Sequence, residues 1–254
     1  MGWGSEPLVL KFIGGQSHFC SVFRACIRKD KRSTKNGAGP MPRPHRRCLP
    51  NTTYHVYSRC IEWKTLLTED SAKDMMIFTL RRTQRKYRFE LIFYQIMDSH
   101  FHLVVRTLHG GATISRIMQY FKARYAESFN RAAKRIGPFW NERFKDTIVE
   151  EHYRSRDEVL GMLWYLAYNP VRHKKEKDPR GYRYGAVNCY LDDKFRTLVE
   201  ITHHAAFTGL GRSMGERIRK FQEFEGIYFN YYDGVRARKA CKNRRWVRIQ
   251  YSRE

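Results

Sequence analysis

The sequence predicts an α+β protein: a ferredoxin-like βαββαβ sandwich with an antiparallel sheet, followed by an extra helix. Four short segments rich in β-branched and aromatic residues predict strands. Two long segments have apolar residues at helical spacing. The second and third strands are separated only by Asp98 and Ser99, which is typical of a tight hairpin turn. The order strand, helix, strand, strand, helix, strand is that of the ferredoxin-like fold.

The elements follow in order along the chain. Strands are predicted in TYHVYSRC (53–60), FELIFYQIM (89–97), HFHLVVRT (100–107) and RFKDTIVEE (143–151). The first helix is expected to begin at Thr68 as its N-cap, and its apolar positions are Ala72, Met75, Met76 and Leu80. The second occupies 112–137 and ends at Gly137-Pro138; its apolar stripe is Ile114, Ile117, Met118, Phe121, Tyr125 and Phe129. The extra helix is expected to begin near Ser155 and to stop at Pro170.

The composition indicates a polyanionic partner. The chain of 254 residues has 49 Lys and Arg against 25 Asp and Glu, a net charge of +24, and nucleic acid is the commonest polyanion in a cell. No apolar run reaches the ~18 residues of a membrane-spanning helix, so no membrane partner is expected. The six cysteines form no Cys-x-x-Cys pair, and the N-terminus has no convincing secretory signal. We therefore expect a cytoplasmic protein.

Composition also divides the chain into three parts. Residues 1–50 are basic, rich in Gly and Pro and without periodicity, which predicts a tail or linker. Residues 51–190 contain the predicted elements and form the expected catalytic domain. Residues 191–254 form a basic C-terminal extension with interspersed aromatic residues, a mixture that suits nucleic acid but also a solvated end.

Two short patterns could carry chemistry. His100 and His102 stand two residues apart in a strand, so both side chains point to one face and could bind a metal together. Tyr165 and Asn169 are four apart in the extra helix and would share a face. A phenol can act as a covalent nucleophile, and an amide oxygen can bind a hard divalent cation. Taken alone, the two histidines could instead be a structural pair, and Tyr165 could be an aromatic residue of the core. Tyr168 is a rival candidate for the nucleophile.

These patterns together resemble the single-tyrosine HUH transposases. The His-hydrophobe-His strand in IMDSHFHLVV is followed by Tyr-x-x-x-Asn-Pro in YLAYNPVRH, and the chain also contains YHVYSRC, ISRIMQYFKARYAESFN and GPFWNERFKD in the family's order. The similarity covers roughly residues 41–190. The insertion-sequence branch of the family has Gln at the position of Asn169, and the REP-associated tyrosine transposases have Asn there. The chain therefore resembles the REP-associated branch more closely.

The resemblance implies a mechanism. His100, His102 and Asn169 would hold Mg²⁺ or Mn²⁺, and Tyr165 would attack a DNA phosphodiester to leave a 5′-phosphotyrosine and a free 3′-OH. The implied substrate is single-stranded DNA with imperfect hairpins, as in REP-like palindromes, and the implied enzyme is a monomer or a homodimer. Two alternatives remain: a hairpin-binding protein that no longer cuts, and a replication or conjugative nickase.

Four further residues are candidates for DNA binding. Arg143 and Lys145 could contact the DNA backbone, or they could lie on a solvated strand. Trp140 could stack on an unpaired base, although a Trp after Gly-Pro is more often a packing residue. Arg172 lies two residues after the Pro of the Tyr-x-x-x-Asn-Pro pattern. Tyr54 and His55 are expected in the core or against the substrate.

Overall fold

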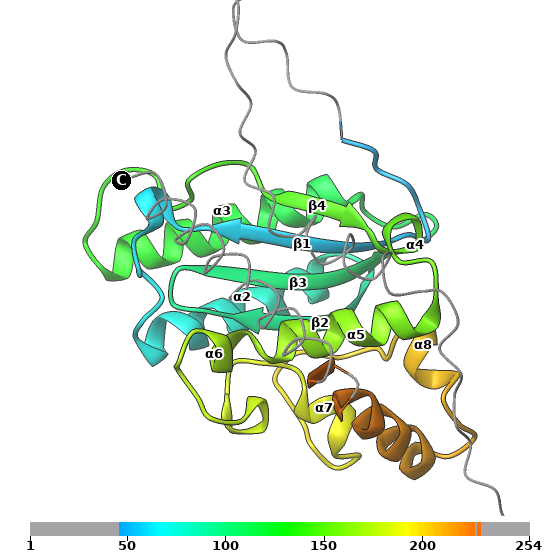
Figure 1. The fold of residues 1–254 in the computed structure, drawn as a ribbon. Coiled ribbons are helices and arrows are strands. Elements are labelled where there is room, and N and C mark those ends of the chain that lie inside the picture. The colour runs from blue at the N-terminus through cyan, green and yellow to red at the C-terminus, as the bar shows by residue number, and fades with distance from the viewer. Residues whose placement is uncertain (1–45, 227, 230–254) are drawn as a thin grey trace, which may run out of the picture. The chain divides into compact units, whose positions relative to one another are not determined.

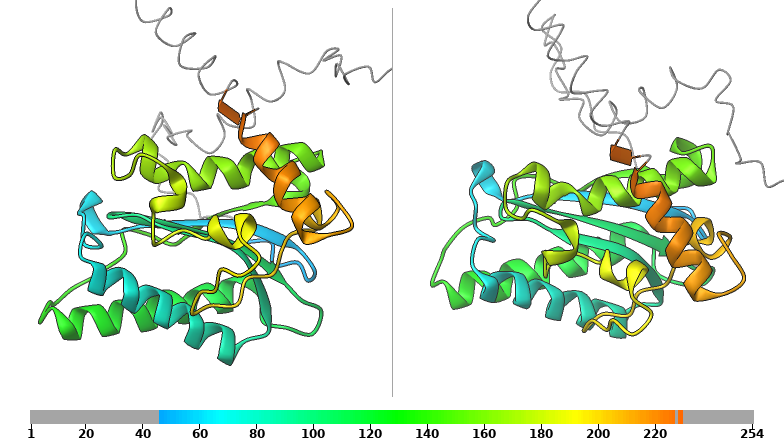
Figure 2. Two further views of the ribbon diagram at one scale, coloured as in Figure 1. Left: turned by 90° about the horizontal axis from the view of Figure 1, so that it is seen from below. Right: turned by 60° about the horizontal axis from the view of Figure 1, so that its bottom comes forward.

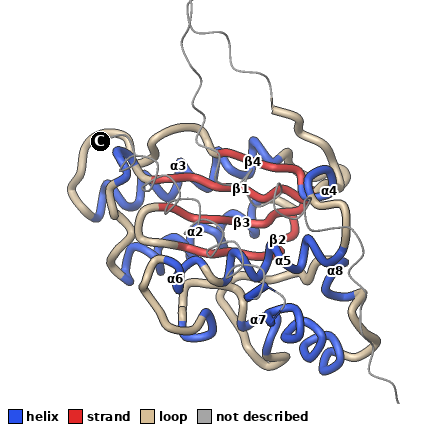
Figure 3. Tube along the Cα trace, viewed as in Figure 1, coloured by secondary structure: helices blue, strands red, loops and turns tan. Residues whose placement is uncertain are grey.

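The computed structural model describes residues 46–226 and 228–229. The predicted tail up to residue 45 and the extension from residue 230 lie outside the described residues. The strands are β1 (Thr53–Arg59), β2 (Phe89–Ile96), β3 (His100–Thr107) and β4 (Lys145–Ile148). They form one antiparallel sheet in the order β2-β3-β1-β4, seen side by side in Figures 1 and 3. Helix α2 (Asp70–Lys86) connects β1 to β2, and α3 (Ile114–Ala132) lies between β3 and β4. The predicted βαββαβ order is confirmed.

Short helical segments complete the described chain. These are η1 (Ile61–Trp63), α4 (Val149–His152), α6 (Asn169–Arg172), η2 (Pro179–Gly181), α7 (Asn188–Leu191) and α8 (Ala205–Thr208). A further helix spans 214–226. No helix within the described ranges is long and apolar enough to cross a membrane.

Helices α2 and α3 cover one face of the sheet (Figure 2). The Phe101 ring of β3 packs edge-on against Phe121 of α3, with ring centroids 5.4 Å apart. Tyr125 of α3 donates its hydroxyl to the Ala72 carbonyl of α2 at 3.1 Å and ties the two helices together. The first five positions of the predicted apolar stripe are fully or almost fully buried, and Phe129 packs against Phe139 at 4.7 Å. The helical periodicity thus identifies the face that packs on the sheet.

Helix α5 (Arg156–Ala167) lies on the other face of the sheet, as Figure 2 shows. Ser155 caps it by accepting the Glu158 N–H, as the sequence predicts. The outer side of α5 is covered by the helix over 214–226. There Trp164 stacks on Phe221 at 4.7 Å and donates its indole N–H to the Phe221 carbonyl at 2.9 Å. The described part of the predicted C-terminal extension therefore packs on the sheet domain.

Several boundaries differ from the sequence expectation. The N-cap of α2 is Glu69 rather than Thr68, whose hydroxyl instead donates to the Thr65 carbonyl. Helix α3 ends at Ala132, before Gly137, and β4 is shorter than the predicted strand at both ends. Helix α5 ends at Ala167, and α6 begins anew at Asn169. The break follows from Pro170, which has no N–H to bond the carbonyl one turn earlier.

Candidate active site

The predicted histidine pair lies on the sheet face turned away from α2 and α3. Phe101 packs toward α3, so strand alternation places His100 and His102 on the opposite side. In the antiparallel register, Arg59 of β1 pairs with His100 and Tyr57 with His102. Directly paired residues share a face, and the Tyr57 ring lies 5.1 Å from His102 and 5.7 Å from His100. The sequence analysis missed Tyr57 and Arg59, because only the register reveals them.

Both histidines use Nδ1 for contacts within the protein. Nδ1 of His100 lies 3.1 Å from the Ser99 hydroxyl. Nδ1 of His102 lies 3.1 Å from Nε2 of His55, a buried residue of β1. A partner on one ring nitrogen fixes the orientation of the ring and leaves the other nitrogen for a ligand. His55, expected only in the core or against substrate, therefore supports His102 directly.

The environment keeps the imidazoles neutral. Burial, reinforced by the charges of Arg59 and His173, lowers the pKa of His100 to about 3. Burial also lowers the pKa of His102 well below its usual value, and His100, His55, Arg172 and Arg59 act in the same direction. A neutral imidazole has the lone pair that a metal ion needs. The surrounding arginines oppose any added positive charge and favour an anion such as phosphate.

The segment after the kink contacts the histidine face and the other predicted residues. The ring of His173, which directly follows α6, lies 5.8 Å from that of His100. Arg172 of α6 donates to Oδ1 of Asn169 at 2.9 Å, and its guanidinium carbon lies 3.9 Å from the Tyr165 ring centroid. Asn169 is buried, and its Nδ2 has no hydrogen-bond partner among the described residues. Tyr165 and Asn169 belong to separate helices rather than one, yet both contact Arg172.

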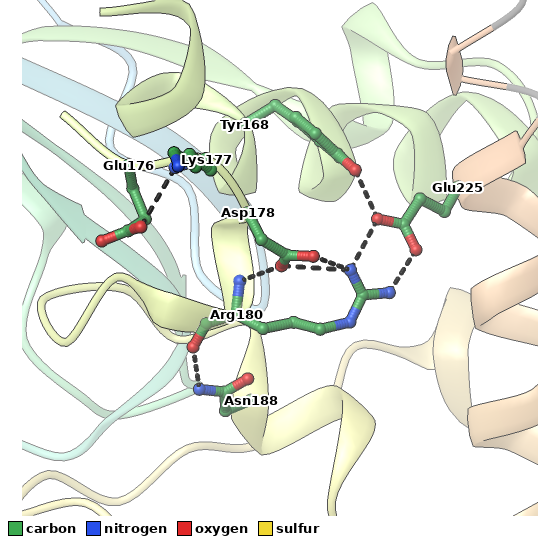
Figure 4. A network of polar contacts seen from close by, with 7 residues as sticks. All are labelled: Tyr168, Glu176, Lys177, Asp178, Arg180, Asn188 and Glu225. Carbon is green, nitrogen blue, oxygen red and sulfur yellow. Dashed lines mark hydrogen bonds and ion pairs between the residues drawn. The ribbon is translucent and has the colours of Figure 1, made fainter. Parts of the chain in front are cut away.

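Tyr168, the rival nucleophile, belongs to a different environment. Its hydroxyl donates to Glu225 of the helix over 214–226 at 2.5 Å, and Glu225 also forms an ion pair with Arg180 (Figure 4). Its ring stacks on Tyr228 at 5.2 Å. Burial and the Glu225 carboxylate raise the pKa of the Tyr168 phenol. These contacts give Tyr168 a structural role, because they join the end of α5 to the helix over 214–226.

An ion-pair cluster joins the two halves of the site. Asp98, in the turn before His100, accepts from Lys73 of α2 at 2.9 Å and from Lys175, which follows α6, at 2.5 Å. Asp98 and Lys73 are buried, while about half of the Lys175 side chain is exposed. The segment after Asn169 is thereby attached to the turn that begins the histidine strand. The sequence analysis did not predict this cluster, since its members are separated by as many as 102 residues.

The donors fit a divalent metal. No group of three or more His, Cys, Asp and Glu side chains within the described ranges is arranged to hold a metal ion. A metal here would instead use the two neutral histidines with the amide oxygen of Asn169; the amide oxygen suits Mn²⁺ and Mg²⁺, whereas imidazole nitrogens suit transition metals. Oδ1 of Asn169 accepts from Arg172, so a metal on the second lone pair of that oxygen would lie close to the guanidinium charge.

The predicted DNA-binding residues are dispersed. Lys145 pairs with Tyr57 and so shares the histidine face; its ammonium lies 3.5 Å from Glu142. Arg143 is exposed in the loop before β4. Trp140 packs against Phe101 and Phe139 and donates its N–H to the Lys122 carbonyl at 2.9 Å. Arg172 lies in the site itself. The packing of Trp140 favours the structural alternative, and DNA contact by the four residues stays a prediction.

Comparisons with known proteins concern the fold and the part of the chain that contains the histidine pair. Residues 48–158 match the family model described as IS200-like transposase, a range that includes the histidine pair and ends before Tyr165 and Asn169. No curated protein matches.

Two solved structures are similar. One is a REP-associated tyrosine transposase bound to a REP hairpin, with a TM-score of 0.50 and 17% identity over 65% of this chain and 96% of that one. The other, from Deinococcus radiodurans R1 and described provisionally as a transposase, has a TM-score of 0.30 and 20% identity over 46% of this chain and 90% of that one. Only the first supports the fold. Over residues 48–158, less than half of its length, the chain is similar to the IS200-like transposase family.

Proposed function

We propose that this protein is a metal-dependent endonuclease and strand transferase for single-stranded DNA, acting beside hairpins as REP-associated transposases do. The observation that carries the proposal is the meeting of two distant segments. His100 and His102 come from the middle of the sheet, and Tyr165, Asn169 and Arg172 come from the α5–α6 region that lies over it. The proposed hairpin substrate is supported by the similar REP-associated structure, which is bound to a REP hairpin, and by the charge of +24.

The chemistry begins at the Tyr165 hydroxyl. Its oxygen attacks the phosphorus, the Oη–P bond forms, the P–O3′ bond breaks, and the phenol proton is lost while the 3′ oxygen gains one. The 5′ end remains on Tyr165, and joining is the reverse attack by a 3′-OH. A divalent metal on His100, His102 and Asn169 would polarise the phosphoryl oxygens.

Three other residues support this step. Ser99 and His55 hold the imidazole rings through their Nδ1 atoms. The guanidinium of Arg172, over the Tyr165 ring, stabilises negative charge that develops on the phenol oxygen. We further propose that one chain supplies both Tyr165 and the histidines of a site, because His173, which directly follows α6, contacts His100 of its own chain.

The test uses single-stranded oligonucleotides from the genomic flanks of the gene, each with a hairpin, together with Mn²⁺. A covalent protein–DNA adduct is expected, visible as a band shift on denaturing gels. Tyr165→Phe removes the attacking oxygen and should abolish the adduct while hairpin binding persists. Tyr168→Phe is the matched control and should keep the adduct.

Three outcomes point elsewhere. An adduct that depends on Tyr168 would refute the assignment of the nucleophile. Cleavage without any adduct would indicate a metal-activated water. Hairpin binding with neither cleavage nor adduct would favour the second candidate, a DNA-hairpin binding protein derived from a transposase, which the engagement of Asn169 by Arg172 also allows.

A further inference from the structure

Arg172 makes three contacts that concern the proposed site. Nη2 donates to Oδ1 of Asn169 at 2.9 Å, Nη1 donates to the Tyr228 hydroxyl at 2.8 Å, and the guanidinium carbon lies 3.9 Å from the Tyr165 ring centroid. One planar cation therefore touches the residue expected to bind metal, the expected nucleophile and the C-terminal segment. A planar guanidinium with five donors can hold several partners in this way.

The contact with Arg172 shows which atom of the Asn169 amide could bind a metal ion and which could not. Arg172 is a pure donor, so the atom facing it must be the carbonyl oxygen. Nδ2, the other end, is buried without a hydrogen-bond partner among the described residues, and an amide nitrogen has no lone pair for a metal. The one atom of Asn169 that can bind a cation therefore already faces a positive charge.

The C-terminal segment holds Arg172 in this position. Tyr228, which accepts from Nη1, is buried and stacks on Tyr168. Tyr168 is fixed by Glu225, and Glu225 by Arg180 (Figure 4). Because these partners are themselves packed and paired, Arg172 is held at Asn169 by more than the single contact with the amide.

We propose that Arg172 withholds Asn169 from metal in the DNA-free protein, and that a DNA phosphate releases Asn169 by taking over the guanidinium. A phosphate offers Arg172 a bidentate, charge-assisted partner, which is stronger than a neutral amide oxygen. Metal and single-stranded DNA then bind with positive cooperativity, and each raises the affinity for the other by the same factor. This inference rests on the proposed function, because it assigns Asn169 to the metal.

The test measures Mn²⁺ affinity by electron paramagnetic resonance of the free ion. All proteins carry Tyr165→Phe, which keeps the ring beside Arg172 and prevents turnover. Without DNA, Arg172→Leu should bind Mn²⁺ about tenfold more tightly than the protein with Arg172, within the usual range of coupling between sites. A hairpin oligonucleotide should raise the affinity of the protein with Arg172 by a similar factor and that of Arg172→Leu much less. The exposed Lys177→Leu, which removes one positive charge from the following loop, should change little.

Further variants separate the explanations. Asn169→Ala added to Arg172→Leu should remove the tenfold gain; a gain that survives would show that only the loss of charge mattered and would overturn the proposal. Equal Mn²⁺ affinity with and without Arg172 would also overturn it. Binding that is unaffected by His102→Ala would instead disprove the metal site of the proposed function.

Tyr228→Phe provides a second route if Arg172→Leu does not fold. It removes one anchor of the guanidinium and should raise Mn²⁺ affinity about two- to threefold without DNA. An affinity unchanged by Tyr228→Phe would then count against the proposal. Near-ultraviolet circular dichroism establishes that each variant is folded.

Discussion

Asp98 forms ion pairs with two lysines, of which Lys73 is buried and Lys175 is about half exposed. Replacing each lysine in turn tests how burial changes the contribution of an ion pair to stability. Lys73 is 5% exposed and also donates to the Thr68 carbonyl at 3.1 Å, whereas the Lys175 side chain is 46% exposed. Removing one partner of a buried ion pair typically costs about 3–5 kcal/mol, whereas an exposed pair contributes about 0.2–1 kcal/mol.

We therefore expect Lys73→Met to lower the free energy of unfolding by about 3 kcal/mol, because Asp98 retains Lys175 as a partner. Lys175→Met should lower it by less than about 1 kcal/mol, because water already screens that pair. In a domain of this size the first change corresponds to a fall in melting temperature of roughly 6–12 °C.

Lys175→Met, the variant with the smaller loss of stability, should show the clear loss of activity. Lys175 attaches the segment after Asn169 to the turn before His100, so Lys175→Met should slow adduct formation about tenfold at a temperature where the variant is fully folded, since small misplacements of reacting groups reduce rates strongly. Urea unfolding and single-turnover adduct formation measure the two effects, and Lys177→Met is the control for charge. Equal losses of stability in the two variants, or normal adduct formation by Lys175→Met, would refute this reasoning.

Three other changes have defined outcomes. Trp164→Ala should lower the free energy of unfolding by about 3–5 kcal/mol, because it removes a fully buried indole that stacks on Phe221; a loss below 1 kcal/mol in urea titrations would mean that the helix over 214–226 does not pack there in solution. Binding of single-stranded DNA should weaken as salt rises, with a log–log slope of about −0.7 for each phosphate neutralised, and Lys145→Ala should make the slope shallower by about 0.7; fluorescence anisotropy at several salt concentrations measures both, and a slope unchanged by Lys145→Ala would place that lysine away from the DNA. A chain that begins at Met41 should fold and form the adduct like the full chain, because residues 1–40 show no helix or strand periodicity; a lower melting temperature for the shorter chain would show that the omitted residues stabilise the fold.

The sequence alone determined the order of the elements and the faces of the most regular ones. Alternation in a strand is a local property, so the sequence could show that His100 and His102 point the same way. The same applies to the apolar stripe of α3, whose positions from Ile114 to Tyr125 are buried as expected. The sequence also predicted that a helix ends at Pro170. The structure shows a break between two helices, α5 and α6, at this point.

The tertiary structure alone decided which residues surround the histidines. Strand register, which no local pattern specifies, brought His55, Tyr57 and Arg59 beside them. Packing of the C-terminal segment on α5 placed Tyr228 against Arg172 and Glu225 against Tyr168. These contacts join residues more than forty positions apart, and their energies depend on the simultaneous fit of many side chains. For that reason the sequence could nominate Tyr165, Asn169 and Arg172, while the contacts of Arg172 with the other two became evident only in the fold.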